Sequence, residues 1–289
     1  MPTLREVRSR IGGVQKTQKI TRAMKMVAAA KLRRAQSRIV AARPYARAMK
    51  ELLADIAQVP ELRGADLIAP REIKNVAIVA VTSDRGFCGA FNASLIRSVQ
   101  AHFDSLPPGV HATLLCVGKK GGDFFGKRAY NVTARHTGVT GTPRFSWAQS
   151  FAADLMARYR NGDFDRIDVI YNEFKSIAQQ RIVIEQFLPI PPPPPAPSRK
   201  KPVDFIYEPD RIGILLSLLP RHLNFQIWRI LLESGTAEEG ARMAAMENAT
   251  ENAREMIATL QLQYNKARQA AITKELLEVV SGAEALRSA

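Results

Sequence analysis

The chain has 289 residues and is 46% hydrophobic, which is enough for a sizeable core in one or two domains. Its 42 Lys and Arg residues outnumber 27 Asp and Glu, and the net charge of +15 indicates an acidic partner such as nucleic acid, an anionic membrane or an acidic protein surface. Cys88 and Cys116 alone argue against a disulfide framework and for a reducing compartment. No apolar run is long enough to predict a membrane span, and the helical pattern from Leu4 leaves no room for a signal peptide.

The first sixty residues predict one helix of a coiled coil. Apolar residues recur in steps of three and four at Leu4, Val7, Ile11 and Val14, and again at Ala28, Leu32, Ala35, Ile39 and Ala42. Between these two runs, Gln18, Thr21 and Lys25 interrupt the apolar register, and Pro44 should kink or end the helix. Residues 1–50 hold fourteen Lys and Arg but one acid, Glu6, so the cations face either solvent or an acidic partner.

Residues 71–210 predict a central α/β domain. Helices and strands alternate, which predicts an open, Rossmann-like sheet that is parallel in its first part. The last two strands read as a pair joined around residues 176–178, and Asn92 reads as the cap of the first helix. Residues 189–202 contain eight prolines and predict an exposed loop of polyproline type. The predicted strands are 76–81, 112–117, 132–136, 167–171 and 181–185, and the predicted helices are 93–103, 119–127 and 146–159.

Residues 211–289 predict the second helix of the coiled coil. Asp210 caps a helix that Pro220 should kink, and a long helix follows from Thr236 to Leu286. Its apolar and small residues step by three and four without a miss, which is typical of a seam that faces a partner helix. After Ala271 the stripe slips by one residue, so the last turns should meet something else. The seam consists of Met243, Met246, Thr250, Ala253, Ile257, Leu260, Tyr264, Ala267 and Ala271, and the slipped stripe of Ile272, Leu276, Val279, Ala283 and Leu286.

Motifs for catalysis or metal binding are incomplete. Residues 121–128 have the GxxxxGK spacing of a phosphate loop, but Arg128 stands where a hydroxyl must hold Mg²⁺. The four histidines lack metal-ligand spacing. Ser83 and Asp84 follow a strand without a nearby histidine, which favours a structural turn, and Cys88 reads as an inert buried thiol. The sequence therefore predicts no catalytic residue, no cofactor and no metal.

Three stretches resemble the gamma subunit of the F-type, proton-translocating ATP synthases, bacterial type. They are residues 11–28, which include TQKITRAMKMVA, residues 82–89, TSDRGFCG, and residues 264–276, YNKARQAAITKEL. Residues 242–246, RMAAM, and 207–210, YEPD, fit the same family. The likeness covers essentially the whole chain.

This resemblance implies a non-catalytic rotor shaft, which couples proton flow through a membrane ring to ATP synthesis or hydrolysis on the beta subunits. It implies three alpha and three beta subunits, the epsilon subunit and the rotor-ring subunit as partners, and a peripheral position on the cytoplasmic face of the bacterial plasma membrane. Family positions that contact beta-subunit loops match Met24, Lys25, Arg242, Arg268 and Gln269. The foot on the ring and epsilon matches Tyr207 and Glu208, and the tip inside a hydrophobic sleeve matches Ile272, Leu276, Val279 and Leu286.

Two other classes of function compete with this interpretation. A basic coiled-coil protein could bind nucleic acid, although residues 1–44 contain no aromatic side chain for base stacking. An α/β enzyme would need a complete phosphate loop or a nucleophile with its base. The family's chloroplast members carry cysteines in a redox insert near residues 189–202, and this chain has none there, so thiol control is not expected.

Overall fold

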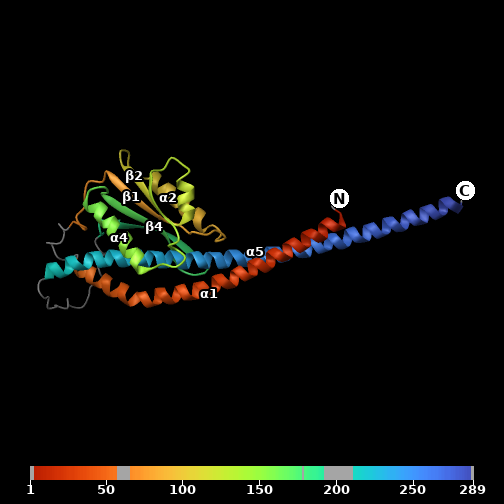
Figure 1. Ribbon diagram of the computed structural model, residues 1–289, viewed down its shortest axis with the longest axis horizontal. Helices are drawn as coiled ribbons and strands as arrows, with labels where there is room; N and C mark the ends of the chain where they lie inside the picture. Colours follow the sequence, from red (N-terminus) through yellow and green to blue (C-terminus); the bar gives the residue numbers. More distant parts are fainter. Residues whose placement is uncertain (1–2, 57–65, 178, 192–210, 288–289) are drawn as a thin grey trace. The chain divides into compact units, whose positions relative to one another are not determined.

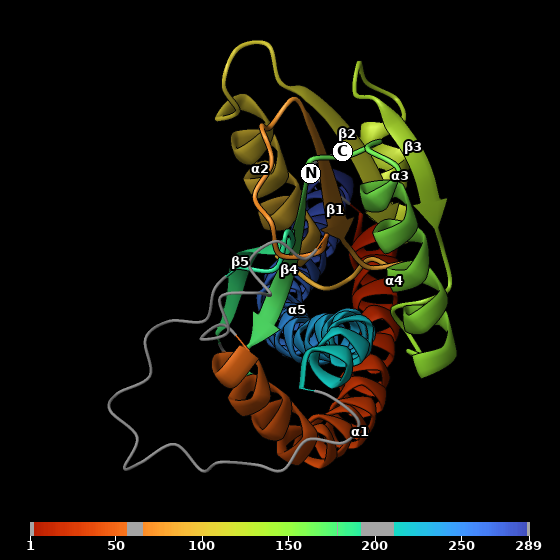
Figure 2. The same ribbon diagram turned by 90° about the vertical axis from the view of Figure 1, so that its left-hand side faces the viewer.

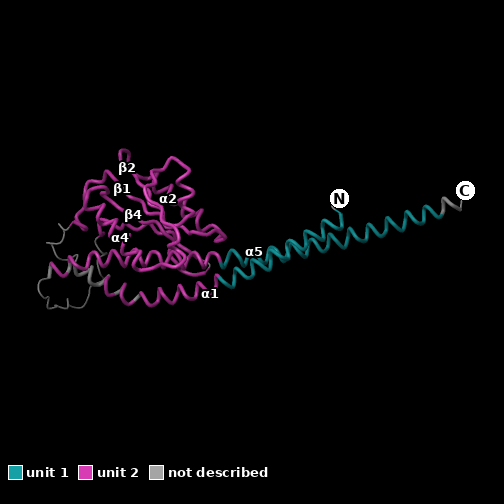
Figure 3. The backbone as a smooth tube through the Cα atoms, viewed as in Figure 1, with its two compact units in different colours: residues 1–27, 243–289 teal, residues 28–242 magenta. Residues whose placement is uncertain are grey.

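The computed structural model describes residues 3–56, 66–177, 179–191 and 211–287 (Figure 1). It divides into two compact units, coloured in Figure 3: unit 1 contains residues 1–27 and 243–289, and unit 2 contains residues 28–242. Both boundaries fall within long helices. Among the described residues, no helix combines the length and hydropathy that crossing a membrane requires.

Two long helices each contribute to both units. Helix α1 runs from Leu4 to Ile56, and α5 runs from Arg211 to Arg287. A reciprocal capping box starts α1, because the Thr3 amide donates to Glu6 Oε2 and the Glu6 amide donates to Thr3 Oγ1. Pro44 and Pro220 lie inside these helices, so neither proline ends its helix. In unit 2 the two helices pack around these positions, and the ring of Tyr45 lies 4.5 Å from that of Phe225.

Five strands among the described residues form one sheet in unit 2, in the order β3-β2-β1-β4-β5. The four strands β3, β2, β1 and β4 pair in parallel, whereas β4 and β5 form an antiparallel hairpin. The expected mixed α/β fold and the hairpin around residues 176–178 are therefore confirmed. The strands are β1 (Asn75–Val81), β2 (His111–Val117), β3 (Val132–His136), β4 (Arg166–Phe174) and β5 (Gln180–Leu188).

Helices cover both faces of the sheet (Figure 2). Side chains alternate between the faces along β1, so Val76, Ile78 and Ala80 pack toward α2 (Phe91–Asp104) and α3 (Lys119–Phe125). Ala77, Val79 and Val81 belong to the opposite cluster, with α4 (Phe145–Arg160) and the first part of α5. Because β1 is buried on both faces, it reads as a continuous apolar run, as the parallel arrangement requires.

The expected cap of α2 was wrong. The helix begins at Phe91, and Ala90 occupies the cap position without a side-chain hydrogen bond. Asn92 lies inside the first turn, and its side chain bonds Ser83 on the neighbouring loop instead. Although asparagine favours helix caps, Asn92 therefore makes a tertiary contact instead.

Candidate functional site: the helix seam and the polar junction

In unit 1, α1 and α5 form an antiparallel pair. The hydroxyls of Thr21 and Thr250 lie 2.8 Å apart, and Lys25 Nζ lies 2.6 Å from Glu247 Oε1. As the chain advances from Thr21 to Lys25 on α1, the partner position moves back from Thr250 to Glu247, which defines the antiparallel direction. The predicted seam on α5 is confirmed, since all nine positions from Met243 to Ala271 are buried or half-buried.

The expected break in the α1 register was wrong. Gln18, Thr21 and Lys25 keep the spacing of three and four, and all three are buried or half-buried. They look out of place because they are polar, but Thr21 and Lys25 have polar partners on α5, Thr250 and Glu247. A polar pair inside an apolar seam favours one register over the shifted ones, since a shift would leave its groups unpaired. This part of the seam therefore contributes specificity to the helix pairing.

The last turns of α5 project beyond the seam. Every residue from Ile272 to Ala283 is exposed, and Ile272, Leu276 and Val279 are 49%, 61% and 70% exposed. Isolated exposed apolar residues are ordinary, but a row of them on one helix marks an interaction surface. The side chain of Leu286 lies outside the described residues, as do Tyr207 and Glu208.

Arg268 and Gln269 lie on α5 near the end of the paired part of unit 1. Both side chains are exposed. Among the described residues, no acceptor engages the Arg268 guanidinium, and the backbone carbonyl of Gln269 accepts the Thr273 hydroxyl at 2.9 Å. The seam residues Ala267 and Ala271 flank them, so both polar side chains stand beside the seam and are free to reach a partner.

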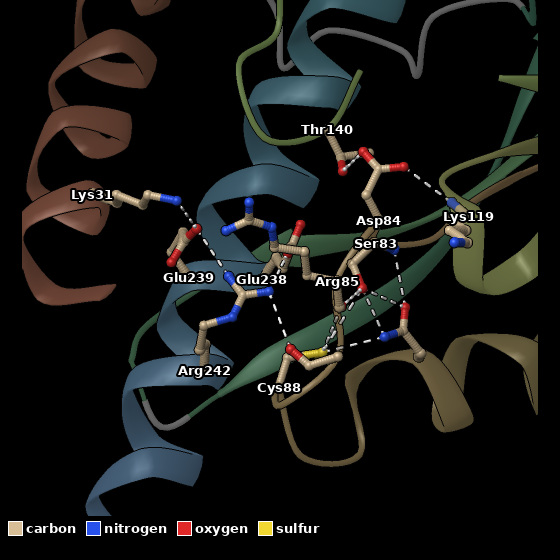
Figure 4. A network of polar contacts seen from close by, with 12 residues as sticks. Lys31, Ser83, Asp84, Arg85, Cys88, Lys119, Thr140, Glu238, Glu239 and Arg242 are labelled. Carbon is tan, nitrogen blue, oxygen red and sulfur yellow. Dashed lines mark hydrogen bonds and ion pairs between the residues drawn. The ribbon is translucent and has the colours of Figure 1, made fainter. Parts of the chain in front are cut away.

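Arg242 lies in a buried polar junction of unit 2 (Figure 4). Its guanidinium pairs with Glu238, lies 2.9 Å from Glu239 Oε1 and donates to the Gly86 carbonyl at 3.4 Å. Lys31 of α1 completes the junction at 3.5 Å from Glu239 Oε1. The junction thus ties α1, α5 and the loop after β1 together. Arg242 is 7% exposed, so its charge is directed inward.

The electrostatics of the junction follow from burial and pairing. Burial raises the pKa of Glu238, and the neighbouring Arg242 charge opposes that shift. Burial alone would lower the pKa of Arg242, but the carboxylates of Glu238 and Glu239 raise it above its usual value. The guanidinium therefore stays charged. Apolar periodicity did not predict this junction, although Glu238 and Glu239 lie four and three residues before Arg242, a spacing at which side chains on a helix can form ion pairs.

The loop between β1 and α2 lies at the carboxyl ends of the parallel strands, where open α/β sheets often bind ligands. Here the chain's own side chains occupy the position. The Asn92 side chain bonds Ser83, Asp84 accepts from the Lys119 amide and from Thr140, and Cys88 is buried beside Ser83. Burial raises the pKa of the Cys88 thiol, so it is a poor nucleophile. These contacts support a structural turn.

Phe87 is the exception in this loop. Its φ is +61°, in the left-handed region that favours glycine, and its side chain is 72% exposed. The Arg85 carbonyl accepts the Ser83 hydroxyl at 2.5 Å, and Gly86 is held by Arg242. The loop therefore fixes an exposed aromatic side chain on a strained backbone.

The segment that resembles a phosphate loop is part of the core. Phe125 of α3 is fully buried, and the Gly121 amide donates to Thr82 Oγ1. A Cβ on Gly118 would lie 2.1 Å from the Thr82 carbonyl oxygen, so close packing explains that glycine. Arg128 folds back over the Phe124 ring. Among the described residues no cluster of His, Cys, Asp and Glu could hold a metal, and His102 instead pairs with Asp168 at 2.9 Å.

Comparisons with known proteins agree with this geometry. The family described as ATP synthase matches residues 3–286. The ATP synthase gamma chain of Chlorobaculum tepidum is 47% identical over 292 residues, covering 99% of this chain and 100% of the relative, and that of Anaeromyxobacter sp. Fw109-5 is 47% identical over 291 residues with 99% and 100% coverage.

Solved structures share the fold. A chain of the Tetrahymena thermophila mitochondrial ATP synthase central stalk and c-ring superposes with a TM-score of 0.62 at 24% identity, covering 80% of this chain and 99% of that one. A chain of the Euglena gracilis mitochondrial ATP synthase rotor gives a TM-score of 0.63 at 21% identity, covering 93% and 98%. The nucleic-acid-binding alternative gains no support from these similarities. The chain belongs to the family of ATP synthase gamma chains.

Proposed function

We propose that this chain is the central rotor shaft of a proton-translocating ATP synthase and itself carries no catalytic site. The observation that carries the proposal is a full-length family match on a chain whose long helix is paired over one stretch and projects alone beyond it. A shaft needs a paired part to resist bending and a tip that can turn inside a collar. Rotation of its asymmetric surface would set the catalytic sites of the beta subunits to different states.

The partners that this function requires are three alpha subunits, three beta subunits, the epsilon subunit and the membrane ring. A complex of this kind would lie on the cytoplasmic face of the bacterial plasma membrane, with the chain as a peripheral component. Exposed Arg268 and Gln269, together with half-buried Met24 and Lys25, are the groups of unit 1 that we assign to beta-subunit loops. Lys25 would exchange its partner Glu247 for an acidic group of the loop. Ile272, Leu276 and Val279 would line the contact with a hydrophobic sleeve, and Tyr207 and Glu208 the contact with the ring and epsilon.

Arg242 takes a different part in this proposal. Its buried guanidinium is already paired with Glu238 and Glu239, so a direct ion pair with a partner would require breaking the junction. We assign Arg242 to holding the Gly86–Phe87 turn, whose exposed ring then faces the beta subunits. This assignment connects Arg242 to the partner through the chain's own loop.

Reconstitution tests the function directly. Co-expression with alpha and beta subunits should yield a complex with three copies of each per copy of this chain, and ATP should drive rotation of a bead attached to the α/β sheet of unit 2. The nucleic-acid alternative predicts binding of duplex DNA by the full chain that weakens steeply with salt. Failure to co-purify with alpha and beta, together with salt-dependent DNA binding, would overturn the rotor assignment.

A further inference from the structure

A pocket of about 180 Å³ opens in unit 2 and has no role in the proposed rotor function. Three segments that are far apart in the sequence form its walls: one face of α1, residues 140–143, and one face of α5. The α1 wall carries Lys31, Arg34 and Arg38, and the α5 wall carries Glu239. Figure 4 labels one residue from each wall: Lys31 of α1, Thr140, and Glu239 of α5.

The charge of the pocket is unbalanced. Its lining contains three cations and one carboxylate, Glu239, and the carboxylate is already shared between Lys31 and Arg242. Arg34 and Arg38 lie one helical turn apart, a spacing at which like charges destabilise a helix. Neither guanidinium meets an acceptor in the part of the chain that the structure describes. An anion placed between them would satisfy both.

The size of the pocket limits the anion. A volume of about 180 Å³ is small for a ligand pocket. Pockets that enclose drug-sized ligands have volumes of roughly 300–1,000 Å³, so this pocket is too small to enclose a nucleotide. A single phosphate with its hydration fits, and guanidinium groups match its oxygens in the two-pronged geometry that makes arginine the preferred phosphate ligand.

Glu239 discriminates among small anions. Its Oε2 atom is buried and out of reach of a ligand, so Oε1, which accepts from Arg242 and lies 3.5 Å from Lys31 Nζ, is the carboxylate oxygen that faces such a ligand. A carboxylate in the wall repels an anion that has only acceptor oxygens. Hydrogen phosphate carries one P–OH group that can donate to a carboxylate, whereas sulfate at neutral pH carries none.

We propose that this pocket is a binding site for inorganic phosphate, held by Arg34 and Arg38 with Lys31 and selected by Glu239. A bound phosphate would join α1 to the 140–143 segment and to α5. Phosphate is also a substrate or product of the reaction that an ATP synthase performs, so the site would expose the shaft to the phosphate concentration. The proposal rests on the pocket alone and does not require the rotor function.

Isothermal titration of the full chain with inorganic phosphate at constant ionic strength tests the proposal. We expect one saturable site per chain, with sulfate at least about tenfold weaker because it lacks the donor. Arg34→Gln with Arg38→Gln should weaken phosphate binding at least about tenfold. Glu239→Gln should reduce the preference for phosphate over sulfate.

The matched control is Arg33→Gln with Arg97→Gln. It removes the same net charge from exposed positions of unit 2 that lie outside the pocket, so phosphate affinity should change by less than about twofold. An equal loss in the control would show general electrostatic attraction and would overturn the site. Absence of saturable binding below about 10 mM, where the free energy of binding falls under about 3 kcal/mol, would overturn it as well.

Discussion

The hydroxyl groups of Thr21 and Thr250 meet at 2.8 Å inside the apolar seam of unit 1. Thr21 Oγ1 also lies 3.1 Å from the Gln18 carbonyl, and Thr250 Oγ1 lies 2.7 Å from the Met246 carbonyl. Each hydroxyl has one hydrogen to donate, so the hydroxyl that donates across the seam cannot also donate to a carbonyl of its own helix. The shorter Thr250 bond favours donation from Thr21 to Thr250.

This pair predicts a specific double-mutant cycle. Thr21→Val or Thr250→Val alone should destabilise the helix pair by about 0.5–1.5 kcal/mol, because the remaining hydroxyl loses its partner. The double variant should be nearly neutral, since two valines of similar shape replace both polar groups. Urea unfolding followed by circular dichroism at 222 nm measures the effect. Additive losses in the double variant would show that the two hydroxyls are not coupled.

The junction predicts a large effect of one arginine. Arg242→Met should destabilise the fold by about 3–5 kcal/mol, because it leaves Glu238 buried without a cation and Glu239 with Lys31 alone. Trp147 and Trp228 both lie in unit 2, so tryptophan fluorescence during urea unfolding reports on the affected unit.

The control for the junction is Arg254→Met on the same helix. Arg254 pairs with Glu251 at 3.7 Å, and both side chains are largely exposed, so its removal should change stability by less than about 1 kcal/mol. Because Arg254 lies in unit 1, the unfolding of the Arg254→Met variant is followed by circular dichroism. If the two substitutions have similar costs, the junction is not a stabilising ion-pair network.

His222 predicts how the stability of unit 2 depends on pH. Burial, followed by the nearby Arg229 charge, lowers its pKa from 6.5 to about 4. The unfolded chain therefore binds more protons than the folded chain between pH 4 and 6.5, and stability rises with pH through this window. The stability that neutral His222 contributes is fully present above about pH 6.5. It is lost as the pH falls toward 4, up to about 3 kcal/mol in total.

His222→Gln should flatten this dependence, as measured by urea unfolding between pH 4 and 7. His136 has a pKa that burial also lowers, so a smaller slope should remain. Substitution of the exposed His111 by Gln is the control and should leave the slope unchanged. A wild-type stability that does not vary over this range would contradict the buried neutral state of His222.

Arg268 and Gln269 predict a coupling defect without an assembly defect. A charge-assisted hydrogen bond in a water-poor collar contributes about 1.5–3 kcal/mol, enough to shift the balance of rotor states about tenfold. Arg268→Ala with Gln269→Ala should slow ATP hydrolysis or uncouple it from proton pumping in the intact complex. The exposed pair Gln263→Ala with Lys266→Ala serves as the control. If the Arg268 and Gln269 variant hydrolyses ATP and pumps protons at wild-type rates, the contact of this part of α5 with the beta-subunit loops is only steric.

The phosphate-loop resemblance predicts an absence that can be measured. The isolated chain should not bind ATP with micromolar affinity, because the glycines pack against Thr82 and Arg135 and no hydroxyl follows Lys127. Equilibrium dialysis with radiolabelled ATP and Mg²⁺ tests this expectation. Tight binding that disappears in Lys127→Ala would refute it.

Local patterns predicted most of the fold. The seam from Met243 to Ala271 was predictable because helix periodicity is a property of neighbouring residues, and β1 because a strand buried on both faces is apolar throughout. Thr21 and Lys25 were misread because polarity was judged without the partner helix. The junction around Arg242 needs Gly86 and Lys31, which are brought together by the fold alone.

The candidate sites also divide into one that could be singled out from the sequence and one that only the fold reveals. Arg268 and Gln269 were singled out through the family resemblance; both are exposed beside the seam, and their contact with beta-subunit loops stays a prediction. The pocket at Arg34 and Arg38 could not be predicted, because its walls come from three segments about 100 residues apart in the sequence and no local pattern encodes their meeting.

The turn at Phe87 is unfavourable for the isolated chain in two respects. A residue with a Cβ in the left-handed region costs about 1–2 kcal/mol relative to glycine, and the phenyl ring stands in water. Glycine at position 87 would relieve both, so Phe87→Gly should make the isolated protein more stable. Phe87 therefore lowers the stability of the free protein. A residue that is unfavourable in both its backbone and its exposed side chain offers a way to find candidate partner contacts from a single chain. At such a position, substitution would stabilise the free protein and weaken the assembly.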